Sequence, residues 1–339
     1  RDRVVDPALI GVAVRNKRNR LFLVWCEETP CGLVALADWD PIDKFLWANL
    51  PWSVRFDGSK PFHPNRYLTD YFGDEAVRAI DANKGRPFFL YLAFNAPHTP
   101  LQAPEAWLKK MAHLADANRR TYAAMIGALD EAVGQIMEKL AATKQTENTL
   151  IFFFSDNGGP NLSSKGKSNF TDNSPLRGAK GMVYEGGMRV PFLICWPAKL
   201  KPSTYDQPVI ALDVLPTALA LAGGTLPTDR SLDGVNLIPY LTGEKQGIPH
   251  ETLYWRTQGP AGPHAVRHGH WKLVHLPGSQ PELYDLDKDI GETKNLTTEK
   301  PEIVAKLSAA ITDWEKDTIQ PVFEGPKKTK TPAAKKSKK

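Results

Sequence analysis

Two oxygen-bearing side chains follow an apolar run near the middle of the chain. Asp156 and Asn157 follow residues 150–154 (LIFFF) after a single serine, and Lys180 lies further on in a glycine-rich stretch. Calcium and magnesium prefer carboxylate and amide oxygens, and nearby glycines let a lysine approach an oxyanion closely. The pattern predicts a metal and an oxyanion bound together. The plainer alternative is a turn, because Asp, Asn and Gly favour turns, with Lys180 as a solvated surface charge.

A histidine lies beyond another apolar run. His98 belongs to residues 95–100 (NAPHTP), which follow the run at residues 87–94, and the two prolines end regular structure there. Histidine titrates near neutral pH and is the commonest proton donor or acceptor in catalysis. His98 is therefore a candidate for proton transfer. The alternative is a loop histidine bonded to a backbone carbonyl.

Strands and helices are predicted to alternate around these residues. Three apolar runs have the length of buried strands: 87–94, 150–154 and 190–196. Two segments have helical patterns: 68–82 and 119–142. This order is typical of a mostly parallel sheet with helices on both faces. Ligands in such sheets gather beyond the carboxyl ends of strands, where His98 and the candidate metal ligands are expected.

The pattern changes toward the C-terminus. Residues 213–223 are predicted to form a helix with an acidic start and a final glycine. Four short strands and one helix follow: 253–255, 265–267, 271–275, 282–286 and 301–316. They predict a small antiparallel sheet with one helix, packed as a second lobe. Four histidines in this lobe are expected to border a substrate cleft rather than bind zinc: His264, His268, His270 and His275.

The composition is that of a globular protein. Of 339 residues, 42% are hydrophobic and 24% are charged, unlike disordered or fibrous chains. No apolar run is long enough to span a bilayer. The net charge of +5 comes from residues 327–339, which hold seven lysines and no acidic residue. We expect this tail to be disordered and solvated, with attraction to polyanions or membranes as the alternative, and we do not predict a nucleic-acid binder.

Several common catalytic motifs do not occur in the sequence. Cys26, Cys31 and Cys195 have neither zinc-finger spacing nor an even count for disulfides. Cys195 lies in an apolar run, as expected of a core thiol. No Walker loop or G-x-S-x-G elbow is present, and no G-x-G-x-x-G follows a strand. The chain begins Arg-Asp-Arg, without an initiator methionine or a signal-peptide pattern.

Four motifs together resemble the type I sulfatases of the alkaline-phosphatase-like superfamily. They are residues 95–100 (NAPHTP), 154–159 (FSDNGG), 176–181 (LRGAKG) and 185–191 (EGGMRVP). Further matches bring the resemblance to about residues 38–317. It implies an α/β fold with a mixed, mostly parallel sheet between helices, and a smaller C-terminal antiparallel sheet plus helix.

The resemblance also implies roles for the residues that match. Asp156 and Asn157 are similar to two ligands of the family's single divalent metal, usually calcium. Lys180 is similar to the lysine that contacts a sulfate oxygen. His98 is similar to the histidine near the ester oxygen, a candidate general acid for the leaving alcohol. Arg177 takes no role from the family pattern.

The N-terminal motifs of the family do not occur in this chain. They are an aspartate pair that completes the metal site, a C-x-P-S-R or S-x-P-S-R motif that yields the formylglycine nucleophile, and a Lys-x-His element. Cys31 lacks the proline and arginine of the nucleophile motif. Two ligands, one of them neutral, are expected to hold calcium weakly, and without the nucleophile most of the rate is lost. We interpret the chain as a truncated or mis-started sulfatase rather than an evolved pseudoenzyme.

The predicted function is therefore sulfuric ester hydrolysis by a sulfatase, with a sulfated glycan or small molecule as its partner. The family implies a periplasmic or extracellular location. The alternatives are a non-catalytic pseudoenzyme that binds sulfated glycans, and a phosphodiesterase or phosphonate hydrolase of the same superfamily. The predicted domains are an unplaced segment at residues 1–37, an incomplete sulfatase core at 38–250, a small lobe at 251–320 and a basic tail at 321–339.

Overall fold

The computed structural model describes three N-terminal strands by their backbone, together with residues 64, 66–161 and 169–318. Cys31 and the basic tail at residues 321–339 lie outside the described residues. The chain divides into two compact units. The first unit holds residues 1–151, 162–171 and 194–202, and the second holds residues 152–161, 172–193 and 203–339.

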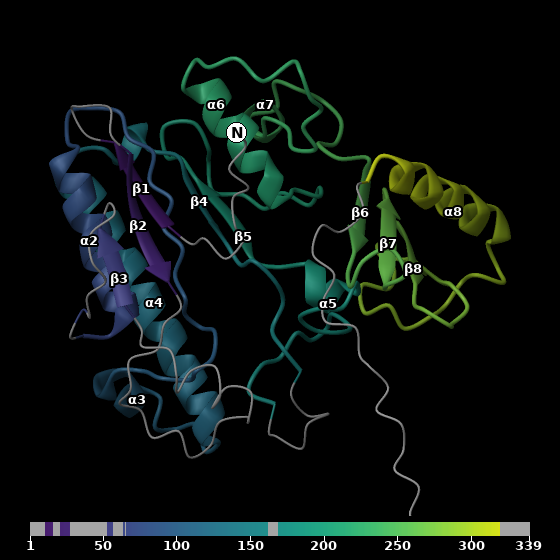
Figure 1. Ribbon diagram of the computed structural model, residues 1–339, viewed down its shortest axis with the longest axis horizontal. Helices are drawn as coiled ribbons and strands as arrows, with labels where there is room; N and C mark the ends of the chain where they lie inside the picture. Colours follow the sequence, from purple (N-terminus) through teal and green to yellow (C-terminus); the bar gives the residue numbers. More distant parts are fainter. Residues whose placement is uncertain are drawn as a thin grey trace, which may run out of the picture. The chain divides into compact units, whose positions relative to one another are not determined.

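Helices dominate the first unit beyond its N-terminal strands (Figure 1). They are α2 (Leu68–Ala82), α3 (Glu105–Lys110) and α4 (Ala117–Ala142), followed by a 3₁₀ turn at Thr146–Asn148. Small residues let α2 and α4 approach closely, since a Cβ on Gly73 would lie 3.0 Å from the Cβ of Ala132. Both predicted helices are confirmed. The second begins slightly earlier than predicted, because the Asp116 carboxylate accepts a hydrogen bond from the Arg119 backbone at 2.7 Å and caps it.

Three strands form an antiparallel sheet near the N-terminus. β1 (Gly11–Arg15) pairs with β2 (Leu21–Glu27), and β2 pairs with β3 (Ser53–Phe56). β2 includes the apolar run at residues 21–25, within the segment that the sequence analysis leaves unplaced. The pairing of β2 with β1 and β3 is not evident from the sequence pattern.

A second pair of strands leads into the candidate site. β4 (Ile151–Phe154) and β5 (Phe192–Cys195) are strands, as their apolar runs predict, and among the described residues they pair as a two-stranded sheet. The rings of Phe154 and Phe192 stack with their centroids 5.0 Å apart. The free thiol of Cys195 belongs to a partly buried residue rather than a fully enclosed one.

The apolar run at residues 87–94 is not a strand, so this sequence prediction is wrong. A strand requires a neighbour that completes its ladder of hydrogen bonds, and no described strand pairs with this run. Phe89 and Tyr91 are exposed at 55% and 50%. His98 therefore follows an unpaired segment instead of a strand within a sheet.

Short helices connect β5 to the C-terminal lobe. They are a 3₁₀ turn at Ala211–Asp213, α6 (Val214–Leu221) and α7 (Ile238–Leu241). The turn and α6 together correspond to the predicted helix at residues 213–223. Fully buried Asp213 holds this region together. Its carboxylate accepts hydrogen bonds from the backbone of Ile210 and Val235 at 2.8 Å each, and lies 2.8 Å from His250 Nε2.

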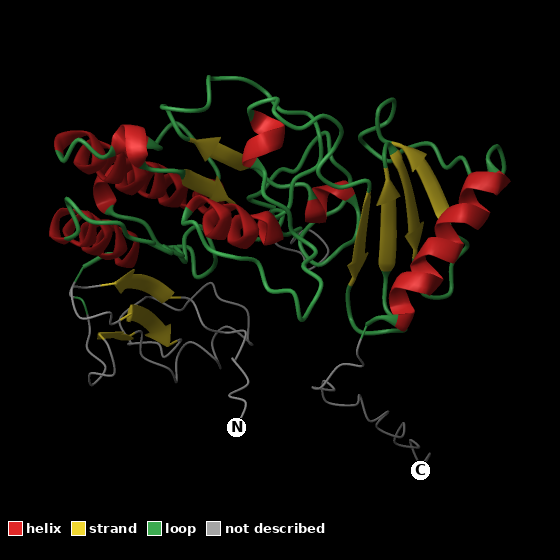
Figure 2. Cartoon of the chain, turned by 90° about the horizontal axis from the view of Figure 1, so that it is seen from above, coloured by secondary structure: helices red, strands yellow, loops and turns green. Residues whose placement is uncertain are grey.

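Four strands and a helix make up the small lobe at the C-terminus. They are β6 (Thr252–Arg256), β7 (His264–His268), β8 (Trp271–His275), β9 (Glu282–Asp285) and α8 (Pro301–Lys316). The strands are antiparallel in sequence order, and α8 lies across the sheet (Figure 2). Leu273 and Leu283 on this face pack with Leu307 of α8. The predicted small sheet with one helix is confirmed.

The other face of this sheet packs against the segment that follows Lys180. Side chains alternate between the faces of a strand, so Val274 and Tyr284 point away from α8. They form a second core with Val183 and Tyr184. The small lobe thus supports part of the candidate site.

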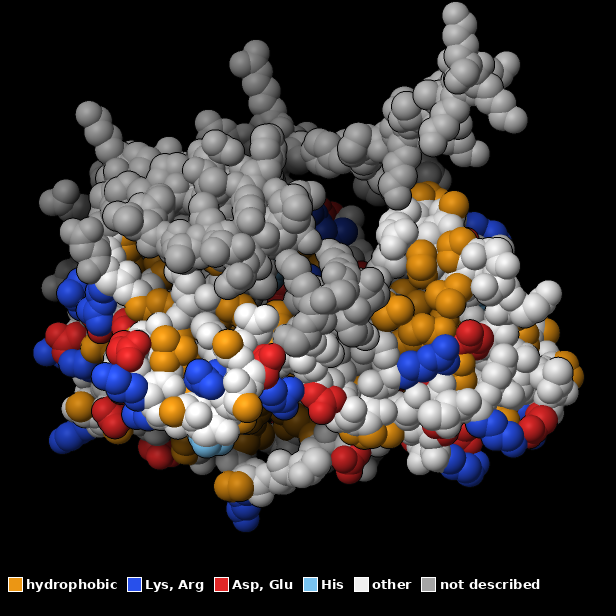
Figure 3. Space-filling model, turned by 90° about the horizontal axis from the view of Figure 1, so that it is seen from below, with side chains coloured by type: hydrophobic (Ala, Val, Ile, Leu, Met, Phe, Trp, Pro, Cys, Tyr) orange, Lys and Arg blue, Asp and Glu red, His pale blue; other side chains and the backbone are white. Residues whose placement is uncertain are grey.

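Charged side chains of both signs are interspersed on the face of the molecule seen in Figure 3. Among the described helices, none combines the length and the apolar character needed to cross a membrane.

Candidate functional site

Two adjoining loops carry three of the candidate residues. We call residues 155–159 the acidic loop and residues 177–187 the glycine loop. The backbone N–H of Gly158 donates to the carbonyl of Gly187 at 3.1 Å. The backbone N–H of Lys180 donates to the carbonyl of Gly159 at 3.1 Å. The structure therefore brings Lys180 beside the loop that carries Asp156 and Asn157.

The functional groups of these loops are accessible. Asp156 and Lys180 are exposed, and Asn157 is partly buried. The Ser155 hydroxyl donates to the backbone carbonyl of Asn157 at 2.9 Å and stabilises the turn. A carboxylate, an amide and an ammonium group on adjoining loops are the chemistry needed to hold a cation and an oxyanion.

Asn173 joins the two loops and is not among the residues predicted from the sequence. Its Nδ2 donates to the carbonyl of Gly159 at 2.9 Å and to that of Gly178 at 3.2 Å. Its Oδ1 accepts from the backbone N–H of Gly159 at 3.0 Å. Its position before a Ser-Pro pair suggests only a turn residue, so no local signal shows this bridging role.

Glycines permit the close approach of the loops. A Cβ on Gly158 would lie 1.8 Å from the backbone oxygen of Gly186, which no side chain tolerates. Gly178 and Gly181 have φ angles of +87° and +84°, in the left-handed region that other residues avoid. The glycine-rich stretch around Lys180 is thus required by backbone geometry.

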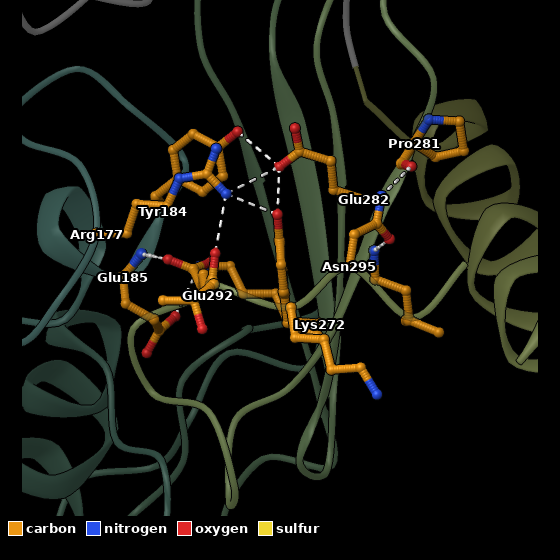
Figure 4. A network of polar contacts seen from close by, with 12 residues as sticks. Arg177, Tyr184, Glu185, Lys272, Pro281, Glu282, Glu292 and Asn295 are labelled. Carbon is orange, nitrogen blue, oxygen red and sulfur yellow. Dashed lines mark hydrogen bonds and ion pairs between the residues drawn. The ribbon is translucent and has the colours of Figure 1, made fainter. Parts of the chain in front are cut away.

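A buried ion cluster lies beneath the glycine loop (Figure 4). Lys272 of β8 is fully buried, and its Nζ lies 2.7 Å from Glu185 Oε1 and 2.9 Å from Glu292 Oε1. The second carboxylate oxygen of Glu292 accepts from the backbone N–H of Glu185 at 2.7 Å. Burial raises the pKa of Glu292, while Lys272 opposes that shift. The cluster fastens α5 (Glu185–Met188), within and just beyond the glycine loop, to the small lobe.

The sequence analysis does not identify this cluster. Its one visible signal is Lys272 itself, a charged residue inside the apolar strand WKLV. A lysine in such a run is either at a surface or paired in the interior. The partners Glu185 and Glu292 lie too far along the chain for a local pattern to reveal.

His98 belongs to the first unit, whereas the two site loops belong to the second. His98 is exposed, and its Nδ1 lies 2.7 Å from the carbonyl oxygen of Thr99. Because a carbonyl oxygen only accepts, Nδ1 carries the proton in this contact. The Nε2 atom is then left to accept a proton, or to donate one when the ring is charged. The predicted backbone contact and a role in proton transfer are therefore compatible.

The described residues supply only part of a calcium site. Asp156 and Asn157 offer oxygen donors of the kind that calcium prefers, but calcium takes about six to eight oxygens. Within residues 66–161 and 169–318, no three His, Cys, Asp or Glu side chains gather as a metal site. The donor chemistry fits calcium in kind, and the donor number does not.

The histidines of the small lobe have contacts within the sheet. His264 and His275 face each other across β7 and β8, with ring centroids 4.8 Å apart. Burial, and secondarily the neighbouring His264, lower the pKa of His275. His268 Nδ1 lies 2.8 Å from the Thr252 hydroxyl. Their predicted place at a substrate cleft stays a prediction.

Comparison with protein families extends the resemblance seen in the motifs. Residues 31–224 match the family described as Sulfatase. Residues 179–317 match the family described as N-sulphoglucosamine sulphohydrolase, C-terminal. The first match covers more than half of the chain and includes all four candidate residues.

Individual relatives agree with this match. The chain is 31% identical over 302 residues to the uncharacterized sulfatase YdeN of Escherichia coli (strain K12), across 76% of this chain and 52% of that protein. It is 32% identical over 264 residues to the steryl-sulfatase of Mus musculus, across 68% of this chain and 41% of that protein. The chain thus spans about half the length of the curated relatives it matches.

A solved structure supports the fold class. The crystal structure of Ps i-CgsB in complex with k-i-k-neocarrahexaose matches with a TM-score of 0.74 and 35% identity, covering 80% of this chain and 59% of that chain. The predicted α/β fold of the alkaline-phosphatase-like sulfatases is thereby confirmed. The chain belongs to the sulfatase family.

Proposed function

We propose that this chain acts in the hydrolysis of sulfate esters, and that its two site loops bind the sulfate group. One observation carries the proposal. The backbone bond from Lys180 to Gly159 sets a lysine beside an exposed Asp156 and a half-buried Asn157. A positive charge on a loop that adjoins hard oxygen donors suits a doubly charged, oxygen-rich group such as sulfate.

Each residue takes a distinct role in this proposal. Lys180 provides a point charge for a sulfate oxygen, and Asp156 and Asn157 provide two oxygens for calcium. When bound, calcium neutralises charge on the sulfate group. In its charged form, His98 gives the Nε2 proton to the departing oxygen, while its Nδ1–H stays bonded to the Thr99 carbonyl.

A sulfated carbohydrate is the substrate class we propose. Two similarities support it: a neighbouring structure was solved with k-i-k-neocarrahexaose, and the C-terminal match is to an N-sulphoglucosamine sulphohydrolase family. A carbohydrate polymer of this kind is met outside the cytoplasm, so we also propose a periplasmic or extracellular location.

The proposal is tested by measuring binding and turnover separately. Isothermal titration with a sulfated oligosaccharide in calcium buffer gives the affinity, and 4-methylumbelliferyl sulfate reports hydrolysis. Lys180→Met is expected to weaken binding at least tenfold, a loss of about 1.4 kcal/mol or more. Lys199→Met is the matched control, since Lys199 is an exposed lysine outside both site loops.

The outcomes separate the alternative functions. Binding without turnover supports the sulfate site, and it is expected both of a non-catalytic sulfated-glycan binder and of a sulfatase chain without the nucleophile motif. A strong preference for bis(4-nitrophenyl) phosphate over the sulfate ester supports a phosphodiesterase. Equal affinities for wild type and Lys180→Met contradict the proposed sulfate site.

A further inference from the structure

Arg177 begins the glycine loop, and the small lobe holds the tip of its side chain (Figure 4). Its Nη1 lies 2.6 Å from Tyr284 Oη, 2.9 Å from the backbone carbonyl of Glu292 and 3.2 Å from Glu282 Oε2. The Tyr284 hydroxyl donates to Glu282 at 2.5 Å. Its oxygen is therefore free to accept from Arg177. All three acceptors come from β9 and the segment that follows it.

The same guanidinium packs against the far part of the loop. Its central carbon lies 4.0 Å from the ring centroid of Tyr184, and the Tyr184 hydroxyl donates to Glu282 at 2.8 Å. Burial and the bond to Glu282 raise the pKa of Tyr184 to about 12, so the hydroxyl stays a donor at neutral pH. Arg177 and Tyr184 therefore hold the loop on both sides of Lys180.

The backbone between these two anchors has little stiffness of its own. Gly178 and Gly181 flank Lys180, and glycine permits many conformations besides the observed one. The Lys180 side chain is exposed. Its backbone bond to Gly159 forms only while the loop keeps its shape.

We propose that Arg177 is a positioning residue for Lys180. By joining the glycine loop to Glu282 and Tyr284, Arg177 holds Lys180 where its ammonium group meets sulfate. The role in sulfate binding rests on the proposed function, whereas the anchoring of the loop does not. Arg177 acts through Lys180, because its own tip is occupied by the small lobe.

A double-mutant cycle tests the link between the two residues. Inorganic sulfate is titrated into wild type, Arg177→Met, Lys180→Met and the double variant, in calcium buffer at low ionic strength. Arg177→Met is expected to weaken binding about tenfold, and the double variant to bind no more weakly than Lys180→Met alone. Arg177→Lys is expected to fall between wild type and Arg177→Met, because lysine keeps the charge and lacks the planar fork.

Two further variants complete the test: Arg230→Met is the folding control, and Tyr284→Phe is a milder change at the same anchor. Arg230→Met removes an exposed arginine that pairs with Asp229 and is expected to keep wild-type affinity. Tyr284→Phe removes one acceptor of Arg177 without removing a charge. It is expected to weaken sulfate binding in the same direction as Arg177→Met, by a smaller factor.

Hydrogen exchange of the ligand-free protein gives a second readout. In Arg177→Met, the amides of Lys180 and Gly186 are expected to exchange faster, while those of α8 stay unchanged. The Lys180 amide bonds to Gly159 across the loops, and the Gly186 amide bonds to the carbonyl of Arg177 within the glycine loop. The proposal is overturned if amide exchange in the glycine loop is unchanged, or if exchange is faster throughout α8. It is also overturned if the losses of sulfate affinity in the two single variants add up in the double variant. If Lys180→Met leaves sulfate affinity unchanged, the proposed function fails, and the exchange rates still decide whether Arg177 anchors the loop.

Discussion

At the scale of single residues, Asn173 carries much of the geometry of the site. One side-chain amide bonds both the N–H and the carbonyl of Gly159, and also the carbonyl of Gly178. Removing such a side chain leaves partly buried backbone groups without partners, which costs more than the bonds themselves contribute. The separation of the two loops thus depends on a residue outside the proposed metal and sulfate ligands.

We expect Asn173→Ala to destabilise the protein by about 1–3 kcal/mol and to weaken sulfate binding. Asn173→Asp keeps the acceptor for the Gly159 N–H but loses both donated bonds, so it is expected to be at least as harmful. Urea unfolding gives the stability and calorimetry the affinity. If Asn173→Ala changes the free energy of unfolding by less than about 0.5 kcal/mol, Asn173 does not join the loops.

Gly158 offers a steric test of the same contact. Gly158→Ala places a methyl group against the Gly186 carbonyl, so the two loops must separate. We expect the free energy of unfolding to fall by about 1–3 kcal/mol and sulfate binding to weaken. Gly134→Ala is the control, because Gly134 lies in α4 with nothing within 4 Å of the added Cβ. It is expected to stabilise by about 0.5–1 kcal/mol. Similar thermal shifts for both variants would contradict the close packing of the loops.

At the scale of elements, the glycine loop depends on the sheet of the small lobe. The loop carries Lys180, while its supports come from β8 and β9 through Lys272, Glu282 and Tyr284. Two kinds of interaction therefore meet at the loop: an ion cluster that is fully buried and an arginine that is partly exposed. The buried cluster is expected to dominate stability, because removing one partner leaves charge in the interior.

Lys272→Met tests the buried ion cluster, and the stability that this variant loses is expected to depend on pH. The variant removes the cation that the carboxylates of Glu185 and Glu292 share. We expect the free energy of unfolding to fall by about 3–5 kcal/mol at pH 8. Burial already raises the pKa of Glu292, and without the lysine that pKa rises further. An acid with a raised pKa in the folded state stabilises the fold below its ordinary pKa and loses that contribution as the pH rises.

Lys272→Met should therefore lower the free energy of unfolding less at pH 5 than at pH 8. Urea unfolding at the two pH values measures this difference. Lys316→Met is the control, because Lys316 pairs with Asp313 and both side chains are exposed, at 69% and 74%. It is expected to change stability little at either pH. A loss in Lys272→Met that does not vary with pH would contradict a charged cluster.

The sequence predicts elements with strong local periodicity and misses contacts between distant residues. The helices α2 and α4 follow from their apolar spacing, and β6 to β9 from short runs separated by turns. The run at residues 87–94 is equally apolar, yet composition does not reveal whether a neighbouring strand pairs with it. Lys272 and Asn173 act through partners far along the chain or across a loop, which no local pattern encodes.

At the scale of the whole molecule, the candidate residues are divided between two units. His98 lies in the first, and Lys180 with Asp156 and Asn157 lies in the second. The motifs around them identify the family, and the packing of the second unit accounts for the glycines at the contact of the two loops. Sulfate binding needs only the second unit in this account, whereas proton transfer needs His98 as well.

A crystal structure of the chain grown with calcium and sulfate tests the central claim most directly. We predict a sulfate ion within hydrogen-bond distance of Lys180 Nζ, and calcium bound to the oxygens of Asp156 and Asn157. Sulfate absent from the two site loops, with Lys180 turned away from Asn157, would contradict the account.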